Sequence, residues 1–136
     1  MSNLCNLQAL KLDGNNLSGQ IAPDFVACAN DILETLSLSD NQFSRSVPDL
    51  IGFSSLRELH LDYNQLNGTL PKSIGELAKL QSLDIASNSL QVVISKAHLF
   101  NLPDLFYLDL SSNSLTFNIS LEWVPPFQLD FLLLAS

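Results

Sequence analysis

The feature that most constrains the fold of this chain is an internal repeat. The pattern LxxLxLxxNxL recurs five times within 136 residues, with Phe43 in its last apolar place once and Ile85 in its third leucine place once. A sixth copy begins at Leu129 and the sequence stops before its asparagine. Such a repeat predicts a stack of similar coils, each in contact only with its neighbours. The five complete copies start at Leu7, Leu33, Leu56, Leu80 and Leu105.

The period and the pattern are typical of leucine-rich repeats, which are 20–29 residues long. They predict one repeat array over residues 1–136, an α/β repeat solenoid with short parallel strands on its concave face. In the LxL part of LxxLxL alternate side chains point to opposite sides of a strand, so Leu59 and Leu61 face inward and His60 faces outward. We expect irregular segments or 3₁₀ turns on the convex face.

An asparagine follows each predicted strand, and successive asparagines are 26, 23, 24 and 25 residues apart. The chain turns away from the sheet there, so backbone groups lose their sheet partners. An amide side chain both donates and accepts hydrogen bonds, and we expect it to satisfy backbone groups in its own coil and the next one. The predicted ladder consists of Asn15, Asn41, Asn64, Asn88 and Asn113.

Three copies continue with variants of LxGx[IVL]P after the asparagine, the third complete over residues 66–71. Gly19 and Gly68 permit a tight backbone path, and Pro48 and Pro71 end the segment because proline lacks a backbone donor. The SIGEL stretch that follows Lys72 predicts a short 3₁₀ or helical turn. Copies four and five have other residues in the glycine and proline places, so we expect a less regular convex side there. These residues are Val92, Phe117, Ser95 and Ser120.

Charge and hydropathy exclude several classes of partner. Six Lys and Arg stand against fourteen Asp and Glu, a formal net charge of −8. Nucleic acids and anionic membrane surfaces are therefore not expected as partners, because each phosphate contact normally needs a basic side chain. No apolar run reaches the roughly 18 residues of a membrane span, and residues 1–20 lack the basic and apolar regions of a signal peptide. We expect no membrane insertion or export by this segment itself.

The outward positions of the predicted strands form the candidate ligand-binding surface, since a rigid array presents many side chains at little ordering cost. Arg and aromatic residues are enriched at interface hot spots, so Arg57, Tyr63, Phe106 and Tyr107 are the candidate anchors. The alternative is that this is a solvated sheet face and that ligand contacts lie on other repeats. The candidate set is Arg57, His60, Asp62, Tyr63, Asp84, Phe106, Tyr107 and Asp109.

Signals for catalysis, metals or cofactors are weak. His60 and Asp62 alternate on one strand face about 6–7 Å apart, with no nucleophile held beside them by a motif, so we interpret them as a surface pair. His98 falls in a predicted convex turn. The two histidines lack the HExxH spacing of a zinc site, and no Gly-rich phosphate, dinucleotide or nucleophile-elbow motif is present. We expect a non-enzyme without cofactor or metal.

Two further features concern covalent modification. Cys5 and Cys28 fall near the ends of successive convex segments and could be close enough for a disulfide, although two free buried cysteines remain an alternative. Three N-x-S/T sequons occur, at Asn16, Asn67 and Asn118. Each asparagine adjoins an inward apolar residue and should point outward, so a glycan is sterically possible at each.

The stretch from Leu56 to Leu77 matches LxxLxLxxNxLxGxIPxxLGxL and resembles the plant-specific class of extracellular leucine-rich repeats. The stretches Lys96–Leu99 (KAHL) and Trp123–Leu129 (WVPPFQL) resemble plant receptor-like proteins, including the group of receptors for fungal xylanase. The resemblance implies a binding module of a cell-surface protein on the extracellular side of the plasma membrane. It also implies a protein or peptide ligand, a kinase co-receptor, a role in defence or development signalling, and use of the sequons in a parent protein.

Two alternatives remain at this stage. The chain also resembles the soluble leucine-rich inhibitors of secreted pectin-degrading enzymes, which use the same concave face. The other alternative is a nonfunctional truncated gene product, because members of the receptor-like family have a signal peptide, caps and a membrane-spanning helix that this sequence does not show.

Overall fold

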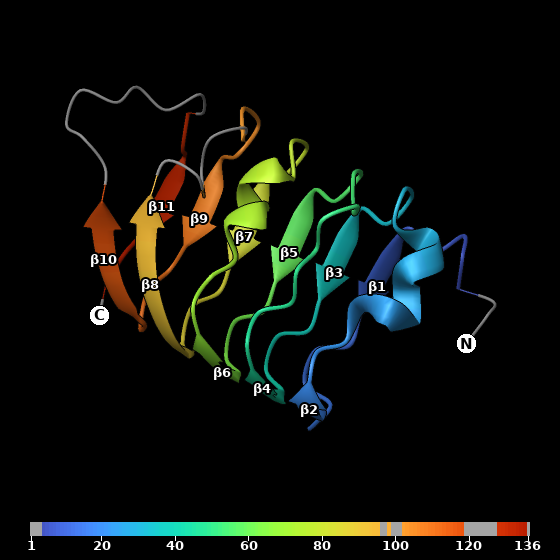
Figure 1. The fold of residues 1–136 in the computed structure, drawn as a ribbon, viewed down its shortest axis with the longest axis horizontal. Helices are drawn as coiled ribbons and strands as arrows, with labels where there is room; N and C mark the ends of the chain where they lie inside the picture. The colour runs from blue at the N-terminus through green and yellow to red at the C-terminus, as the bar shows by residue number, and fades with distance from the viewer. Residues whose placement is uncertain (1–3, 96–97, 99–101, 119–127, 136) are drawn as a thin grey trace.

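The computed structural model describes residues 4–95, 98, 102–118 and 128–135. Each copy of the repeat contributes one three-residue strand to a six-stranded parallel sheet with the order β1-β3-β5-β7-β9-β11 (Figure 1). Each of the four inner strands therefore pairs with the strand one repeat earlier and the strand one repeat later, and β1 and β11 form the two edges of the described sheet. The strands are β1 (Ala9–Lys11), β3 (Thr35–Ser37), β5 (Glu58–His60), β7 (Ser82–Asp84), β9 (Tyr107–Asp109) and β11 (Phe131–Leu133).

The register of this sheet aligns the middle leucine of every strand in one row. Leu36, Leu59, Leu83 and Leu108 are each at most 3% exposed, and they lie directly opposite one another on neighbouring strands. Burying a leucine contributes roughly 1.5–3 kcal/mol, and each of these side chains is covered by the coils on either side. Stability therefore comes from stacking, and the predicted leucine-rich-repeat solenoid is confirmed.

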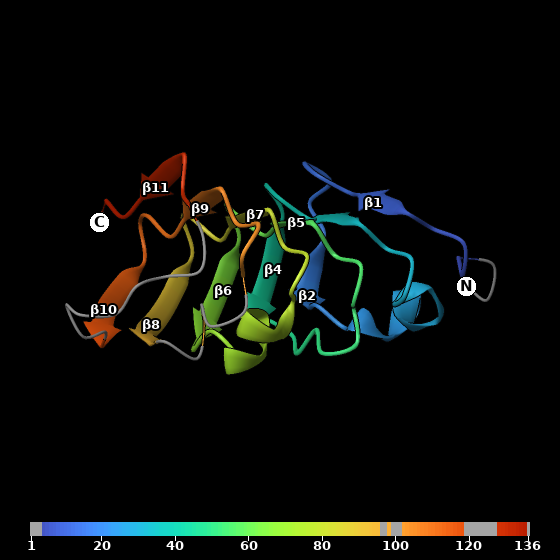
Figure 2. The same ribbon diagram turned by 90° about the horizontal axis from the view of Figure 1, so that it is seen from above.

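A second parallel sheet, which the repeat pattern did not predict, lies behind the first. Its order is β10-β8-β6-β4-β2, and Figure 2 shows its strands as a row separate from that of the first sheet. Because every coil follows the same path after its asparagine, equivalent segments run side by side and pair their backbone groups. The strands are β2 (Ser18–Gln20), β4 (Gln42–Arg45), β6 (Gln65–Gly68), β8 (Ser89–Ser95) and β10 (Ser114–Asn118).

The expectation of a less regular path in copies four and five was wrong for the part that the structure describes. β8 and β10 are the longest strands of the second sheet and pass through Val92 and Phe117, the positions that replace the glycine. Gly19, inside β2, and Gly68, the last residue of β6, have φ of +89° and +78°, a left-handed conformation that bends the chain. Without that bend, β8 and β10 stay extended and pair over five residues. Ser120 lies outside the described residues.

The predicted 3₁₀ turns lie on the side of the stack away from the six-stranded sheet (Figure 2). η1 (Pro23–Ala29) is kinked at Val26, and η2 (Lys72–Glu76) contains the SIGEL stretch apart from its last residue, Leu77. Pro71 precedes η2 in an extended conformation, with φ of −61° and ψ of 138°, so its fixed φ is compatible with the end of the extended segment. Ile74 of η2 is buried and packs into the core.

The asparagines after the strands form a hydrogen-bond ladder. The Asn41 amide nitrogen donates to the carbonyl oxygens of Leu38 and Ser39 in its own coil and of Leu12 in the first coil. Its Oδ1 accepts from the backbone N–H groups of Asn15 and Leu17, also in the first coil. The same pattern recurs in later coils, with carboxamide oxygens accepting from the coil before. The residues that repeat it are Asn64, Asn88 and Asn113.

The expectation that each asparagine bonds to the next coil was therefore wrong, because the partner is the preceding coil. In a parallel strand the N–H and C=O of one residue point to the same side. Leu12 donates its N–H to Ser37 of the second coil, so its carbonyl also points toward that coil and meets Asn41 there. In the first coil, the side-chain nitrogen of Asn15 donates only to the carbonyl oxygens of Leu12 and Asp13, which belong to its own coil.

A disulfide joins the segment that precedes the first coil to the convex part of that coil. Cys5 and Cys28 are bonded, with Cα atoms 4.8 Å apart, so the structure favours the bridge over the alternative of two free thiols. The last described strand, β11, exposes Phe131, Leu132 and Leu133, with 41–56% of each side chain accessible. Leu132 is exposed although it continues the buried leucine row, because no coil covers it in the part of the chain that the structure describes.

Candidate ligand-binding surface

The outward side chains of the six-stranded sheet form two rows that cross the strands. We call this surface the sheet face. One row contains Glu58, Ser82, Tyr107 and Phe131, and the other contains His60, Asp84, Asp109 and Leu133. Because neighbouring strands lie about 4.8 Å apart, adjacent members of a row can contact one another directly. The repeat therefore converts residues 24 or 25 positions apart in the sequence into lateral neighbours.

The four candidate anchors do not form one cluster. Tyr63 is 62% exposed in the turn after β5, and Phe106 is 39% exposed just before β9. β7 lies between these two strands, so a ligand that touches both must cross the sheet face. Arg57 lies before β5 and its guanidinium is 3.9 Å from the Glu34 carboxylate, with both side chains about half exposed.

Tyr107 has an aromatic neighbour that was not among the candidate surface residues. Its ring centroid is 5.8 Å from that of Phe131, and the two ring planes are tilted by 47°. Aligning the truncated sixth copy with the fifth would have placed these residues side by side, because both hold the same position in the repeat. The pair adds a broad apolar contact area at the end of the sheet face that β9 and β11 form.

Carboxylates gather beside these aromatics. Asp84 lies between His60 and Asp109 in its row, and Asp62 follows β5 on the same side. The pKa of Asp84 is raised to about 6, chiefly by burial and also by the charges of Asp62 and Asp109. The hydrogen bond from the Ala86 N–H and the His60 ring act in the other direction. The centre of the sheet face is thus crowded with negative charge.

Hydrogen bonds fix these carboxylates in place. Asp62 Oδ1 accepts from the Ser39 hydroxyl at 2.5 Å, and Asp84 Oδ1 accepts from the Ala86 N–H at 3.0 Å. Asp109 Oδ1 accepts from both the backbone N–H and the hydroxyl of Ser111. The protein holds one oxygen of Asp62 and one of Asp84, which leaves the second oxygen of each as an acceptor for a ligand.

The Tyr107 hydroxyl is kept as a neutral donor. Burial raises the pKa of Tyr107, and the charges of Asp84, Asp109 and Asp62 raise it further. The phenol therefore stays protonated at neutral pH, and its hydroxyl is hydrogen-bonded to the Asp109 side chain.

His60, Asp62 and Asp84 lie closer together than the sequence spacing indicated. One possible ligand atom from each residue lies within 4.8 Å of the other two, and all three residues are partly buried. The expected distance of about 6–7 Å was that between the backbone positions of His60 and Asp62 along one strand. The third residue, Asp84, comes from the neighbouring strand β7. The expectation of no metal site considered only spacing along the chain.

The second histidine has a structural position. His98 is 3% exposed, its Nδ1 accepts from the Ser95 N–H at 3.1 Å, and its Nε2 lies 3.0 Å from the Leu70 carbonyl oxygen. Since Nδ1 accepts, the proton of the neutral ring is on Nε2 and is donated to Leu70. The ring joins the third coil to the fourth.

The sequons differ in what the structure describes of them. Asn16 is exposed in the turn after β1, and Asn67 is exposed in β6. Both side chains are therefore accessible to a glycan, in agreement with the outward placement expected from the sequence. The side chain of Asn118 lies outside the described residues, as does nearly all of the KAHL and WVPPFQL stretches.

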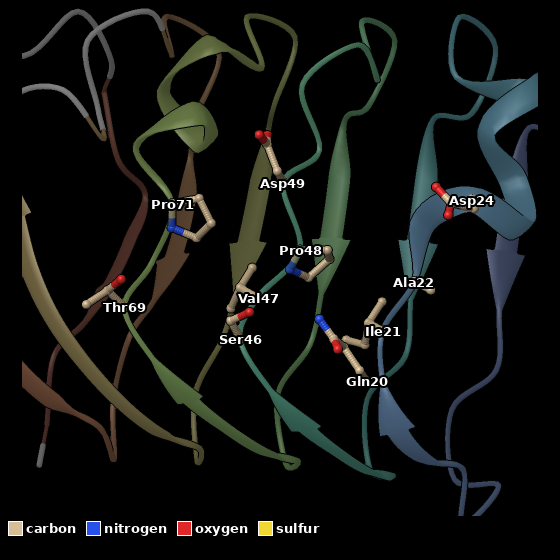
Figure 3. Close-up of a pocket in the computed structure, with 10 residues that line it drawn as sticks. All are labelled: Gln20, Ile21, Ala22, Asp24, Ser46, Val47, Pro48, Asp49, Thr69 and Pro71. Atoms are coloured by element: carbon tan, nitrogen blue, oxygen red, sulfur yellow. The ribbon is translucent and has the colours of Figure 1, made fainter.

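An open groove of about 650 Å³ lies behind the second sheet, where three successive coils leave it (Figure 3). Asp24 and Asp49 contribute carboxylates, and Pro48 and Pro71 contribute apolar walls. Most of its lining comes from the ends of the three LxGx[IVL]P segments, although the sequence alone did not indicate that these segments enclose a groove. Its ten lining residues are Gln20, Ile21, Ala22, Asp24, Ser46, Val47, Pro48, Asp49, Thr69 and Pro71.

Comparison with known proteins agrees with this architecture. Models of the leucine-rich-repeat family match residues 6–28, 33–53 and 54–115. The chain belongs to the leucine-rich-repeat family. Over 85 residues, which are 61% of this chain and 9% of the relative, it is 42% identical to Receptor-like protein 32 of Arabidopsis thaliana. As a leucine-rich-repeat protein it is thus similar to plant receptor-like proteins, and it spans about a tenth of the length of that curated relative.

Solved leucine-rich-repeat ectodomains have the same fold. The plant peptide hormone receptor RGFR1, solved in complex with RGF2, superposes with a TM-score of 0.76 at 34% identity over 82% of this chain and 18% of that one. The Arabidopsis receptor kinase HAESA, solved with the peptide hormone IDA and the co-receptor SERK1, gives 0.71 at 28% identity over 95% and 26%. Within the described residues, no helix is both long and apolar enough to cross a membrane.

Proposed function

We propose that this leucine-rich-repeat chain is a protein- or peptide-binding segment of the extracellular part of a plant cell-surface receptor-like protein. The observation that carries the proposal is the sheet face, where exposed aromatic side chains adjoin fixed carboxylates on a rigid scaffold. Aromatic anchors with few rotatable bonds lose little entropy on binding. Similarity to a receptor-like protein and to receptors solved with peptide hormones supports it.

The charges of the sheet face define the expected ligand. Asp62, Asp84 and Asp109 lie near its centre, whereas Arg57 is near the Glu34 carboxylate. A peptide with basic side chains for the carboxylates and an aromatic or aliphatic side chain for Tyr107 and Phe131 is complementary to this arrangement. By analogy with HAESA, solved with a peptide hormone and a co-receptor, we propose a kinase co-receptor and a role in defence or development signalling. The proposed segment binds and does not catalyse.

Selection from a peptide library tests this proposal even though the natural ligand is unidentified. The purified chain is panned against a phage-displayed library of random peptides in the presence of a chelator, and enriched peptides are synthesised and titrated by calorimetry. We expect basic and aromatic peptides, and a loss of affinity of about tenfold or more in a Tyr63→Ala, Tyr107→Ala double variant.

The control variant is Asp24→Asn, in the groove behind the second sheet, which should bind as the wild type does. Enriched peptides that bind the double variant with unchanged affinity, or that lose affinity only in the groove variant, would remove the sheet face as the binding surface.

A further inference from the structure

The group formed by His60, Asp62 and Asp84 is a product of two neighbouring strands. His60 ends β5, Asp62 lies two residues later on the same side, and Asp84 of β7 is directly opposite His60 in the register. Two residues along a strand and one step across it define a triangle of side chains that project the same way. Their potential ligand atoms lie within 4.8 Å of one another.

The electrostatics of this group call for a cation. Asp84 is partly buried beside the like charges of Asp62 and Asp109, which together disfavour its ionised form more than the Ala86 N–H and the His60 ring favour it. Within the described part of the chain the sole ion pair is that of Arg57 with Glu34, so no lysine or arginine neutralises Asp62 or Asp84. A bound cation would remove this repulsion.

We propose that His60, Asp62 and Asp84 bind one divalent transition-metal ion of the Zn²⁺ type. An imidazole nitrogen with two carboxylates suits zinc, whereas Ca²⁺ takes six to eight oxygen ligands and Mg²⁺ retains several waters. Zinc holds such ligands about 2.0–2.2 Å away, so ligand atoms around it lie roughly 3.3 Å apart. The potential ligand atoms are up to 4.8 Å apart without an ion, so binding requires them to move closer together.

The hydrogen bonds already present support this coordination. The Ser39 hydroxyl holds one oxygen of Asp62, and the Ala86 N–H holds one oxygen of Asp84. Such outer contacts orient metal ligands and are part of most metal sites. Three protein ligands leave the fourth position of a tetrahedral zinc ion open, where water or a carboxylate of a bound peptide can coordinate.

Other soft ligands in the chain do not compete. Both cysteines are joined in the disulfide, and both ring nitrogens of His98 face partners in the core. With two histidines and two cysteines in the whole sequence, His60 is the one imidazole or thiol available to an external ion. The inference does not depend on the proposed function, because metal binding is measured on the chain alone.

Calorimetric titration of the untagged, chelator-treated chain with Zn²⁺ tests the proposal, together with the visible absorption spectrum after addition of Co²⁺. At slightly alkaline pH, where Asp84 is ionised, we expect one ion per chain and cobalt bands of a low-coordinate nitrogen and oxygen site. His60→Ala and Asp84→Asn should each lower zinc affinity at least about tenfold, since even outer-shell substitutions reduce metal affinity that much. Far-UV circular dichroism verifies that both variants are folded.

The matched control is Asp104→Asn, which removes an exposed carboxylate from the turn before β9. It should retain wild-type affinity and the cobalt spectrum. No heat of binding up to millimolar Zn²⁺ would overturn the proposal, as would equal zinc affinity in the wild type, His60→Ala and Asp84→Asn. Displacement of Zn²⁺ by an equal concentration of Ca²⁺ would also overturn it, because it would identify an oxygen-only site without His60.

Discussion

Asn64 accepts a hydrogen bond from the backbone N–H of Phe43, 3.0 Å away and 21 residues earlier in the chain. The same side chain donates to carbonyl oxygens of its own coil and of the coil before. One amide thus satisfies backbone groups on two levels of the stack, at the point where the sheet can no longer do so. This links each turn to the position of the preceding coil.

Replacing Asn64 by Ala should lower the free energy of unfolding by about 1–3 kcal/mol, the usual penalty for leaving buried backbone groups unpaired. Urea denaturation monitored by circular dichroism measures the change in midpoint. Asn64→Asp should be nearly as destabilising, because a carboxylate accepts from Phe43 but cannot donate to the carbonyl groups.

Asn67→Ala is the control for this prediction, since Asn67 is an exposed residue of the same coil. Its midpoint should stay within about 0.5 kcal/mol of the wild type, the usual range for surface substitutions. An unchanged midpoint for Asn64→Ala would mean that the ladder contributes nothing to stability.

Asp84→Asn should stabilise the chain at neutral pH. Because the pKa of Asp84 is raised to about 6 from 3.8, the folded state holds its proton more tightly than the unfolded state does. Wild-type stability from this group is therefore fully present below about pH 4 and is lost as the pH rises through 6. The amide cannot ionise, and it keeps an oxygen for the Ala86 N–H.

Thermal melts of both proteins in chelator measure the difference. One pKa unit corresponds to 1.36 kcal/mol, and after a discount for partial solvent access we expect a gain of about 1 kcal/mol near pH 7.5 that vanishes near pH 4. A gain of equal size at both pH values would show that ionisation of Asp84 is not its cause.

The sequence predicted those parts of the fold that depend on the repeated pattern itself. The inward leucines, the strands and the positions of the ladder asparagines depend on local period, so Leu59 and Asn64 were placed correctly. The second sheet has no such signal, because segments such as SGQ at residues 18–20 lack the alternation of a half-buried strand. It forms because equivalent segments of neighbouring coils are brought side by side.

For the candidate site, the sequence predicted which residues are lateral neighbours but not which side chains converge. Alignment of the copies already placed Asp84 in the coil next to His60, and the register confirms that they are opposite one another. The convergence of His60, Asp62 and Asp84 depends on side-chain rotamers and on bonds such as that from Ser39 to Asp62, which no spacing rule contains. The direction of the ladder likewise depends on which side of the strand each carbonyl faces.

His98→Leu should destabilise the fold although leucine fills a similar volume. The substitution leaves the Leu70 carbonyl and the Ser95 N–H without their partners in a buried position. We expect a loss of about 1–3 kcal/mol in the free energy of unfolding, measured by urea denaturation. His60→Ala, on the sheet face, should change it by no more than about 0.5 kcal/mol in chelator. Equal effects of the two substitutions would contradict the structural role of His98.

Arg45→Gly should stabilise the chain, because Arg45 occupies the repeat position of Gly19 and Gly68 with the same left-handed backbone. Its φ is +72°, against +89° and +78° for the two glycines. A non-glycine residue in this region destabilises the fold by about 1–2 kcal/mol. Glycine has greater conformational freedom in the unfolded chain, which reduces the benefit of the substitution by about 0.5–1 kcal/mol. We therefore expect the free energy of unfolding, measured by urea denaturation, to increase by about 0.5–1 kcal/mol.

Gly68→Ala is the reciprocal change, and a Cβ added there meets no atom within 4 Å, so its cost isolates the backbone effect. It should lose about 1 kcal/mol, and a stabilising Gly68→Ala would refute the assignment of strain to this position.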